Sequence, residues 1–189
     1  MNIPVIISIS SIIVWALPPF KQYRTDYFYF FLILAFTSPF NIIIIYLLRI
    51  SPLLIAVMSS FLLISSLMSY KKQRYFFVIL SIISFVISFG FSIHRNTLII
   101  LLILTHIIVV LILINSFIKH LQETKAVNLF LILLVTYEFI NIVKFIAGLL
   151  SFEQGAISYH LPSFIHLFLG ITFIFVSLKT KDFPILSQD

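Results

Sequence analysis

Three polar residues interrupt the apolar run VTYEFINIVKFIAGLL, which covers residues 135–150. Glu138, Asn141 and Lys144 follow one another at intervals of three residues. Residues three apart on a helix lie on one broad side, and such a stripe drifts slowly around the axis. A carboxylate beside an amide and an amine can bind a polar ligand or exchange a proton, so these residues are candidates for a site.

Three further polar residues, Asn41, His106 and His166, lie near the middle of other apolar runs. If these runs are helices of one bundle, four helices bring polar groups to a similar depth. Glu138 then has three ways to avoid being a lone buried charge. It can pair with a histidine, it can pair with Lys144 through Asn141, or it can carry a proton itself.

Two interpretations of this cluster remain open. In the first, Glu138 and Asn141 hydrogen-bond across helices and Lys144 reaches the membrane interface, which is a structural role. In the second, the cluster is a ligand pocket open to the outer side, a proton-coupled transport site or a catalytic site. The candidates for ligand or proton binding are Glu138, Asn141, His106, His166, Asn41 and Lys144.

Familiar catalytic and metal-binding patterns are missing from the sequence. His160 and His166 are six residues apart, whereas two metal ligands on one helical face need a spacing of four. No Asp lies inside an apolar run, no G-x-G-D or G-x-S-x-G motif occurs, and the chain contains no Cys. The last apolar run has no lysine that could carry a retinal chromophore. We therefore predict no catalytic residue, no metal and no cofactor.

The composition indicates which elements must position these residues. Of 189 residues, 61% are hydrophobic and only 10% are charged, and the mean hydropathy is +1.20. Soluble domains average about 25% charged residues, and a helix crosses a bilayer with about 20 apolar residues. We predict an all-α polytopic membrane protein, a single bundle of seven transmembrane helices at about residues 3–20, 27–48, 52–70, 75–93, 97–118, 127–150 and 158–178.

The connections between these spans are short and polar. Ser51-Pro52 predicts a helix start, with serine as N-cap and proline at the first helical position. KKQR at residues 71–74 and HLQETKA at residues 120–126 are expected to be loops. The N-terminal run lacks the basic start and cleavage site of a signal peptide, so we expect it to be the first span.

The basic residues predict the orientation of the bundle, because cytoplasmic loops carry an excess of Lys and Arg. With the N-terminus outside and the C-terminus inside, Arg49 and Arg95 are external and Lys144 is intramembrane. The other nine of the twelve basic residues are cytoplasmic: Lys21, Arg24, Lys71, Lys72, Arg74, Lys119, Lys125, Lys179 and Lys181. Topology thus explains the net charge of +6, and we expect no nucleic-acid partner. The expected location is the bacterial inner membrane.

Small residues form stripes on two of the predicted spans. They are Ser84, Ser88 and Ser92, four apart on the fourth span, and Ser59 and Ser66, a heptad apart on the third. Such stripes allow membrane helices to approach closely. They predict packing within the chain or an interface with another chain, which could be a different membrane protein or a second copy.

Two spans also align weakly at an offset of 100 residues. TDYFYFFLILAFTSPFNIII then faces KAVNLFLILLVTYEFINIVK, with Asn41 opposite Asn141. Duplicated halves with a substrate site between them are common in transporters. A 3+1+3 repeat is therefore one interpretation of this alignment.

Longer patterns resemble known classes of protein. The segments FKQYRTDYFYFFLILAF and KKQRYFFVIL, with the Glu- and Asn-bearing sixth span, resemble small seven-span proteins common in Bacteroidota and detached seven-helix sensor modules. ALPPFKQYRTD, residues 16–26, is similar to the proline-glutamine loop of 3+1+3 sugar transporters, with Pro18-Pro19 in place of Pro-Gln. The first resemblance implies a sensor, and the second implies transport.

The prediction for function is a non-enzymatic integral membrane protein, either a receptor-like sensor or an accessory subunit of a larger membrane complex. The alternative is a small-solute transporter coupled to protons at Glu138, and a membrane-embedded hydrolase is a third. For a sensor, we expect a pocket open to the outer side that is lined by Asn41, His106, Glu138, Asn141 and His166.

Overall fold

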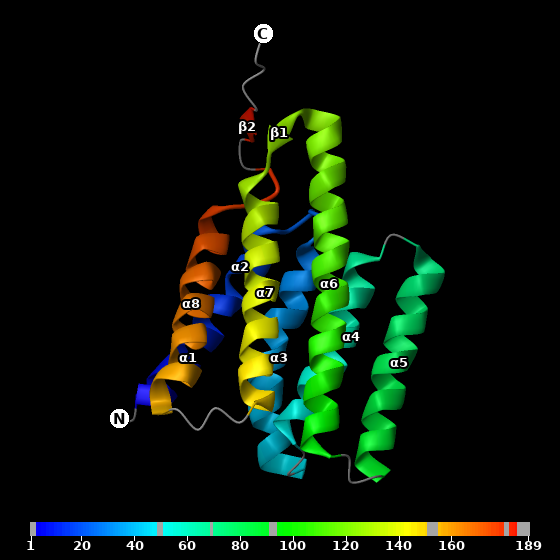
Figure 1. The fold of residues 1–189 in the computed structure, drawn as a ribbon, viewed down its shortest axis with the longest axis vertical. Helices are drawn as coiled ribbons and strands as arrows, with labels where there is room; N and C mark the ends of the chain where they lie inside the picture. Colours follow the sequence, from blue (N-terminus) through cyan, green and yellow to red (C-terminus); the bar gives the residue numbers. More distant parts are fainter. Residues whose placement is uncertain are drawn as a thin grey trace.

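The computed structural model describes residues 3–48, 51–68, 70–90, 94–150, 155–179 and 182–184. These residues are almost entirely helical (Figure 1). The helices are α1 (Ile3–Ala16), α2 (Pro18–Lys21), α3 (Phe28–Leu48), α4 (Pro52–Leu67), α5 (Lys71–Gly90), α6 (Arg95–Thr124), α7 (Leu129–Leu149) and α8 (Gly155–Phe175). Two short strands, β1 (Ala126–Val127) and β2 (Phe183–Pro184), pair in antiparallel fashion. The predicted all-α class is confirmed.

Six of the seven predicted spans each correspond to one helix and the first corresponds to two, and prolines set two of the boundaries. The first span is broken into α1 and α2 at Leu17, because Pro18 and Pro19 lack the N–H groups that a continuous helix needs. Helix α4 begins at Pro52, as predicted. Ser51 occupies the N-cap position, although its side chain makes no capping hydrogen bond.

The two connections expected to be loops are helical, and both expectations are wrong. KKQR forms the first turn of α5, and residues 120–124 of HLQETKA form the last turn and more of α6. Lys, Gln, Arg, Leu and Glu are all good helix formers, so polarity alone did not end these helices. Helix α6 ends where Lys125 adopts a left-handed conformation, with a φ of 53°.

Six helices pack in a closed ring, in the order α1, α3, α4, α6, α7 and α8, and α8 returns to α1. Helix α5 packs against α4 at the edge of this ring (Figure 1). The short α2 lies against α3 and α8. Since every ring helix has two neighbours, the ring can enclose polar side chains from several helices.

The exterior of this bundle is apolar and part of its interior is polar. Large side chains such as Phe36, Phe168 and Phe175 are exposed, whereas Gln22 and Glu138 are completely buried. A soluble protein rarely exposes so many large apolar side chains. Among the described residues, α6 and α7 are the two helices long and apolar enough to cross a membrane by length and composition. Apolar stretches of 10–17 residues occur in the α1–α2 segment, α3, α4 and α8.

Candidate functional site

A cavity of about 480 Å³ lies between α1, α3, α7 and α8. Asn41 and Lys144, on its wall, lie in the second halves of α3 and α7. Both helices end at the same end of the bundle, where α1 and α8 begin (Figure 1). The cavity therefore extends from mid-bundle toward that end. Its polar lining consists of Ser11, Thr37, Ser38, Asn41, Tyr137, Asn141, Lys144, Ser163 and His166, and its apolar lining of Ile12, Trp15, Leu34 and Ile42.

Four of the six predicted site residues meet at this cavity: Asn41, Asn141, Lys144 and His166. The wall contains one ammonium group, an imidazole, two amides and several hydroxyls, and none of the thirteen lining residues is Asp or Glu. Two buried polar atoms, Asn41 Oδ1 and His166 Nε2, have no hydrogen-bond partner among the described residues. The chemistry of this wall suits a small polar solute, and a single negative charge on that solute would complement Lys144.

The other two predicted residues, Glu138 and His106, do not line this cavity, which corrects the expected pocket. The residues of α7 that face it are Tyr137, Asn141 and Lys144, spaced at i, i+4 and i+7. This spacing keeps side chains on one narrow helical face. Glu138 is one residue out of phase, so it points toward α6 instead.

Glu138 forms the histidine partnership that was one of its three predicted options. Its Oε2 lies 2.5 Å from Nδ1 of His106 on α6. Glu138 is 0% exposed and His106 is 7% exposed. The imidazole also packs against the Phe145 ring, with 5.3 Å between the ring centroids. The second carboxyl oxygen, Oε1, has no hydrogen-bond partner in the described part of the chain.

A layer of aromatic rings adjoins the cavity on the side that faces the opposite end of the bundle, where α3 and α7 begin. Trp15 and Tyr137 line the cavity, and their ring centroids lie 4.8 Å apart. Behind them, Phe173 lies 6.2 Å from Trp15 and 5.0 Å from Phe31. Phe31, Phe130 and Phe173 are each completely buried. These rings fill the centre of the bundle, so the described side chains leave the cavity closed on that side.

Sequence reasoning missed several lining residues, namely Ser11, Trp15, Tyr137 and Ser163. A signal for three of them was present. Ser11 and Trp15 are four apart, and Tyr137 completes the i, i+4, i+7 face described above. Tyr137 also packs on the ring of His166, with 5.0 Å between centroids. Asn41 and Asn141, matched by the weak internal alignment, line the same cavity, while the repeat itself stays a prediction.

Three of the stripe serines hydrogen-bond within their own helices. Ser59, Ser66 and Ser84 each donate a hydrogen bond to a carbonyl of their own helix, over 2.7–2.9 Å. The Ser88 side chain and the whole of Ser92 lie outside the described residues. Two serines outside the stripes join α5 to α4: Ser81 donates to the Met58 carbonyl over 3.0 Å, and Ser65 donates to the Arg74 carbonyl over 3.1 Å. The predicted partner interface stays a prediction.

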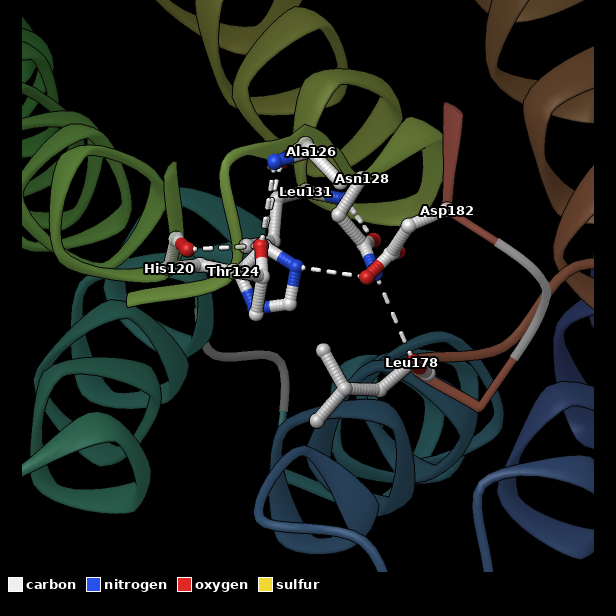
Figure 2. Close-up of polar contacts among 7 residues, drawn as sticks. All are labelled: His120, Thr124, Ala126, Asn128, Leu131, Leu178 and Asp182. Carbon is white, nitrogen blue, oxygen red and sulfur yellow. Dashed lines mark hydrogen bonds and ion pairs between the residues drawn. The ribbon is translucent and has the colours of Figure 1, made fainter. Parts of the chain in front are cut away.

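A second polar cluster, which was not predicted, lies beside β1 and β2 at the other end of the bundle (Figure 1 and Figure 2). Asn128 caps α7, because its Oδ1 accepts a hydrogen bond from the Leu131 N–H over 3.2 Å. Its Nδ2 donates to Oδ1 of Asp182 over 2.6 Å, and Nε2 of His120 donates to Oδ2 over 2.9 Å. Together with the β1–β2 pairing, these bonds fix the segment after α8 against the α6–α7 connection.

Neither cluster has the ligands of a metal centre, since no group of three or more His, Asp or Glu side chains converges among the described residues. The cavity instead offers hydrogen-bond donors and one cation. Compared with models of protein families, with curated proteins and with solved structures, the chain matches none.

Proposed function

We propose that the chain is a seven-span membrane protein that binds a small organic anion in the cavity between α1, α3, α7 and α8. The observation that carries this proposal is a polar cavity with one lysine, inside a bundle whose exterior is apolar. A polar solute gains little from an apolar surface, whereas a desolvated wall of donors recognises it strongly. Lys144 supplies the charge, and the amides of Asn41 and Asn141 supply hydrogen bonds.

Helix lengths support the membrane placement. Helices α3, α7 and α8 have 21 residues each, α5 has 20 and α6 has 30. At about 1.5 Å per residue, 21 residues cover about 30 Å, the thickness of the hydrocarbon core. Helix α4, with 16 residues, is shorter, and local thinning of the bilayer accommodates a short span.

The distribution of charge supports an orientation with the N-terminus outside. Lys21, Lys71, Lys119 and Lys125 belong to helix ends and turns in the part of the bundle nearer β1 and β2 (Figure 1). Basic residues favour the cytoplasmic side. In this orientation the cavity faces the outer side, because it extends toward the opposite end of the bundle.

Access from one side favours a receptor-like sensor. The buried aromatic rings of Phe31, Phe130 and Phe173 close the cavity toward the proposed cytoplasmic side. A bound ligand touches four helices at once and can change how they pack against each other. The signal then passes through helix contacts to a partner chain, for which the serine-bearing faces of α4 and α5 are the proposed surface.

Trp15 allows a direct test, because it is the sole tryptophan of the chain and it lines the cavity. Lactate and benzoate, added to detergent-purified protein, should change its fluorescence with saturation. The neutral propane-1,2-diol and benzyl alcohol have similar shapes and should not. Lys144→Gln should abolish the response, whereas Lys119→Gln, at an exposed site, should preserve it. Equal responses from the Lys144→Gln variant and the unmodified protein would contradict the proposal.

Proton-coupled transport is the second candidate, and the buried Glu138–His106 pair is the observation that favours it. Such pairs serve as proton relays in membrane transporters. Glu138→Gln keeps the size of the side chain but removes its proton. Loss of pH-dependent solute uptake into proteoliposomes by this variant alone would favour transport over sensing. Copurification of stoichiometric partner chains, with no response to any anion, would instead indicate an accessory subunit.

A further inference from the structure

We propose that a second, apolar groove between α1, α2 and α3 holds an acyl chain of an anionic phospholipid, whose phosphate lies at Lys21 and Arg24. The groove has a volume of about 690 Å³. This proposal rests on the membrane placement proposed above, but not on the ligand of the polar cavity.

The lining of the groove is chemically uniform. It consists of aliphatic, proline and aromatic side chains, and the hydroxyl of Tyr23 is the sole polar side-chain group among the lining residues. Ala16 and Ala35 leave room between the helices, while Phe20, 81% exposed, and Phe36, 64% exposed, form outward walls. An open groove on the bilayer-facing surface is filled by hydrocarbon, since a single hydroxyl offers too few polar partners to hold water there.

The groove has the length of one leaflet. It follows α3 from Phe28 to Pro39, which are eleven residues apart. At about 1.5 Å per residue this distance is about 16 Å, or about half of the hydrocarbon core. The Phe28 end lies at the proposed cytoplasmic end of the bundle (Figure 1). A single acyl chain from that leaflet therefore spans the groove.

Basic residues lie at the end of the groove where a headgroup would be. Tyr23 lines this end, and the guanidinium carbon of Arg24 lies 5.5 Å from the centroid of the Tyr23 ring. Lys21 and Arg24 are both exposed. Arginine binds phosphate with two parallel hydrogen bonds, and tyrosine favours the level of the lipid headgroups. Charge and depth thus both select an anionic headgroup.

The turn that carries these residues is held in place. Gln22, completely buried, donates a hydrogen bond from Nε2 to the Val176 carbonyl over 3.0 Å. The Thr25 hydroxyl donates to the Gln22 carbonyl over 2.7 Å. Arg24 adopts a φ of 65°, in the left-handed region that few residues other than glycine occupy. Lys21 and Arg24 are therefore presented by a fixed turn and not by a loose tail.

The test is native mass spectrometry of the detergent-purified full chain with added phosphatidylglycerol or phosphatidylcholine of identical acyl chains. The unmodified protein should bind phosphatidylglycerol preferentially. Lys21→Gln/Arg24→Gln should weaken that binding at least about fivefold. Ala35→Trp, which fills the groove, should weaken the binding of both lipids. Lys71→Gln/Lys72→Gln removes two exposed charges at the same end of the bundle, and should behave like the unmodified protein.

Three results would overturn the proposal: equal binding of the two lipids, an unchanged Lys21→Gln/Arg24→Gln variant, or an equal loss in the Lys71→Gln/Lys72→Gln variant. All charge variants lie at exposed sites, so they should fold even if Ala35→Trp does not. Membrane fractionation separates the two proposals. A membrane-bound protein without lipid preference refutes the lipid site alone, whereas protein recovered without membranes refutes the placement on which both proposals depend.

Discussion

The buried pair of His106 and Glu138 permits a quantitative prediction. Nδ1 of the imidazole is 2.5 Å from Oε2 of the carboxyl, and Oε1 has no other hydrogen-bond partner among the described residues. His106→Leu therefore leaves both carboxyl oxygens without a partner in a site with 0% exposure. We expect this variant to lose about 3–5 kcal/mol of the free energy of unfolding, the usual cost of breaking a buried pair.

The complete double-mutant cycle separates the pair from its surroundings. Glu138→Leu alone leaves a buried imidazole without its partner and should cost about 1–3 kcal/mol. The double leucine variant removes both polar groups, and an apolar replacement of a buried pair is close to neutral. The coupling between the two sites should therefore be at least about 4 kcal/mol, the sum of the two smallest single losses. Unfolding in mixed detergent and sodium dodecyl sulfate, followed by Trp15 fluorescence, gives these free energies.

An exposed pair on the same helix is the matched control. Lys119 Nζ and Glu123 Oε1 are 3.9 Å apart at i, i+4, with side chains 70% and 63% exposed. The same cycle there should give no more than about 0.5 kcal/mol. If the coupling energy between His106 and Glu138 is no larger than that of this control pair, the reasoning from burial and partnership is refuted.

Two further predictions concern helix packing and the segment after α8. A Cβ atom at Gly170 would lie 2.7 Å from Cγ1 of Val14, so Gly170→Ala should destabilise the protein by about 1–3 kcal/mol. Gly148→Ala, with nothing within 4 Å, should be neutral or stabilising by up to about 1 kcal/mol in the same unfolding assay. Asp182→Ala removes the acceptor for Asn128, and should increase the rate of limited proteolysis after α8 without lowering the melting temperature by more than a few degrees. An unchanged cleavage rate would contradict the role assigned to these hydrogen bonds.

The helices were predictable because hydrophobic length is a strong signal, although their bounds were not: α6 runs to Thr124, beyond the predicted end at residue 118, and the first predicted span is divided into α1 and α2. Charged residues misled the prediction at KKQR and HLQETKA. Both segments continue helices, because helix propensity and not polarity decides where a helix ends once it has left the apolar layer. The left-handed Lys125, which ends α6, carries no signal in its residue type.

The candidate site was predictable in composition but not in arrangement. Glu138, Asn141 and Lys144 were chosen as one stripe, yet a spacing of three drifts around the helix. The structure divides them between two faces: Asn141 and Lys144 line the cavity with Tyr137, and Glu138 pairs with His106. Only the packing of α7 between α6 and α8 decides which face each residue joins. That packing depends on contacts far apart in the sequence.

The contacts of Asp182 were not predictable for the same reason. Its partners, His120 and Asn128, precede it by 62 and 54 residues. Nothing in the local pattern of a short polar segment signals a docking site. The N-cap role of Asn128, by contrast, follows a common rule, because asparagine before an apolar run is a helix start.

The access of water to the cavity from the outer side tests the account most directly. The chain has no Cys, so single cysteine variants can be labelled without background. Ser38→Cys and Ser163→Cys, in the cavity wall, should react with a membrane-impermeant maleimide in intact cells but not in inside-out vesicles. Glu123→Cys, near the C-terminal end of α6 and at the opposite end of the bundle, should show the reverse. Labelling of both cavity positions from the cytoplasmic side, or from neither side, would contradict an outward-facing binding cavity.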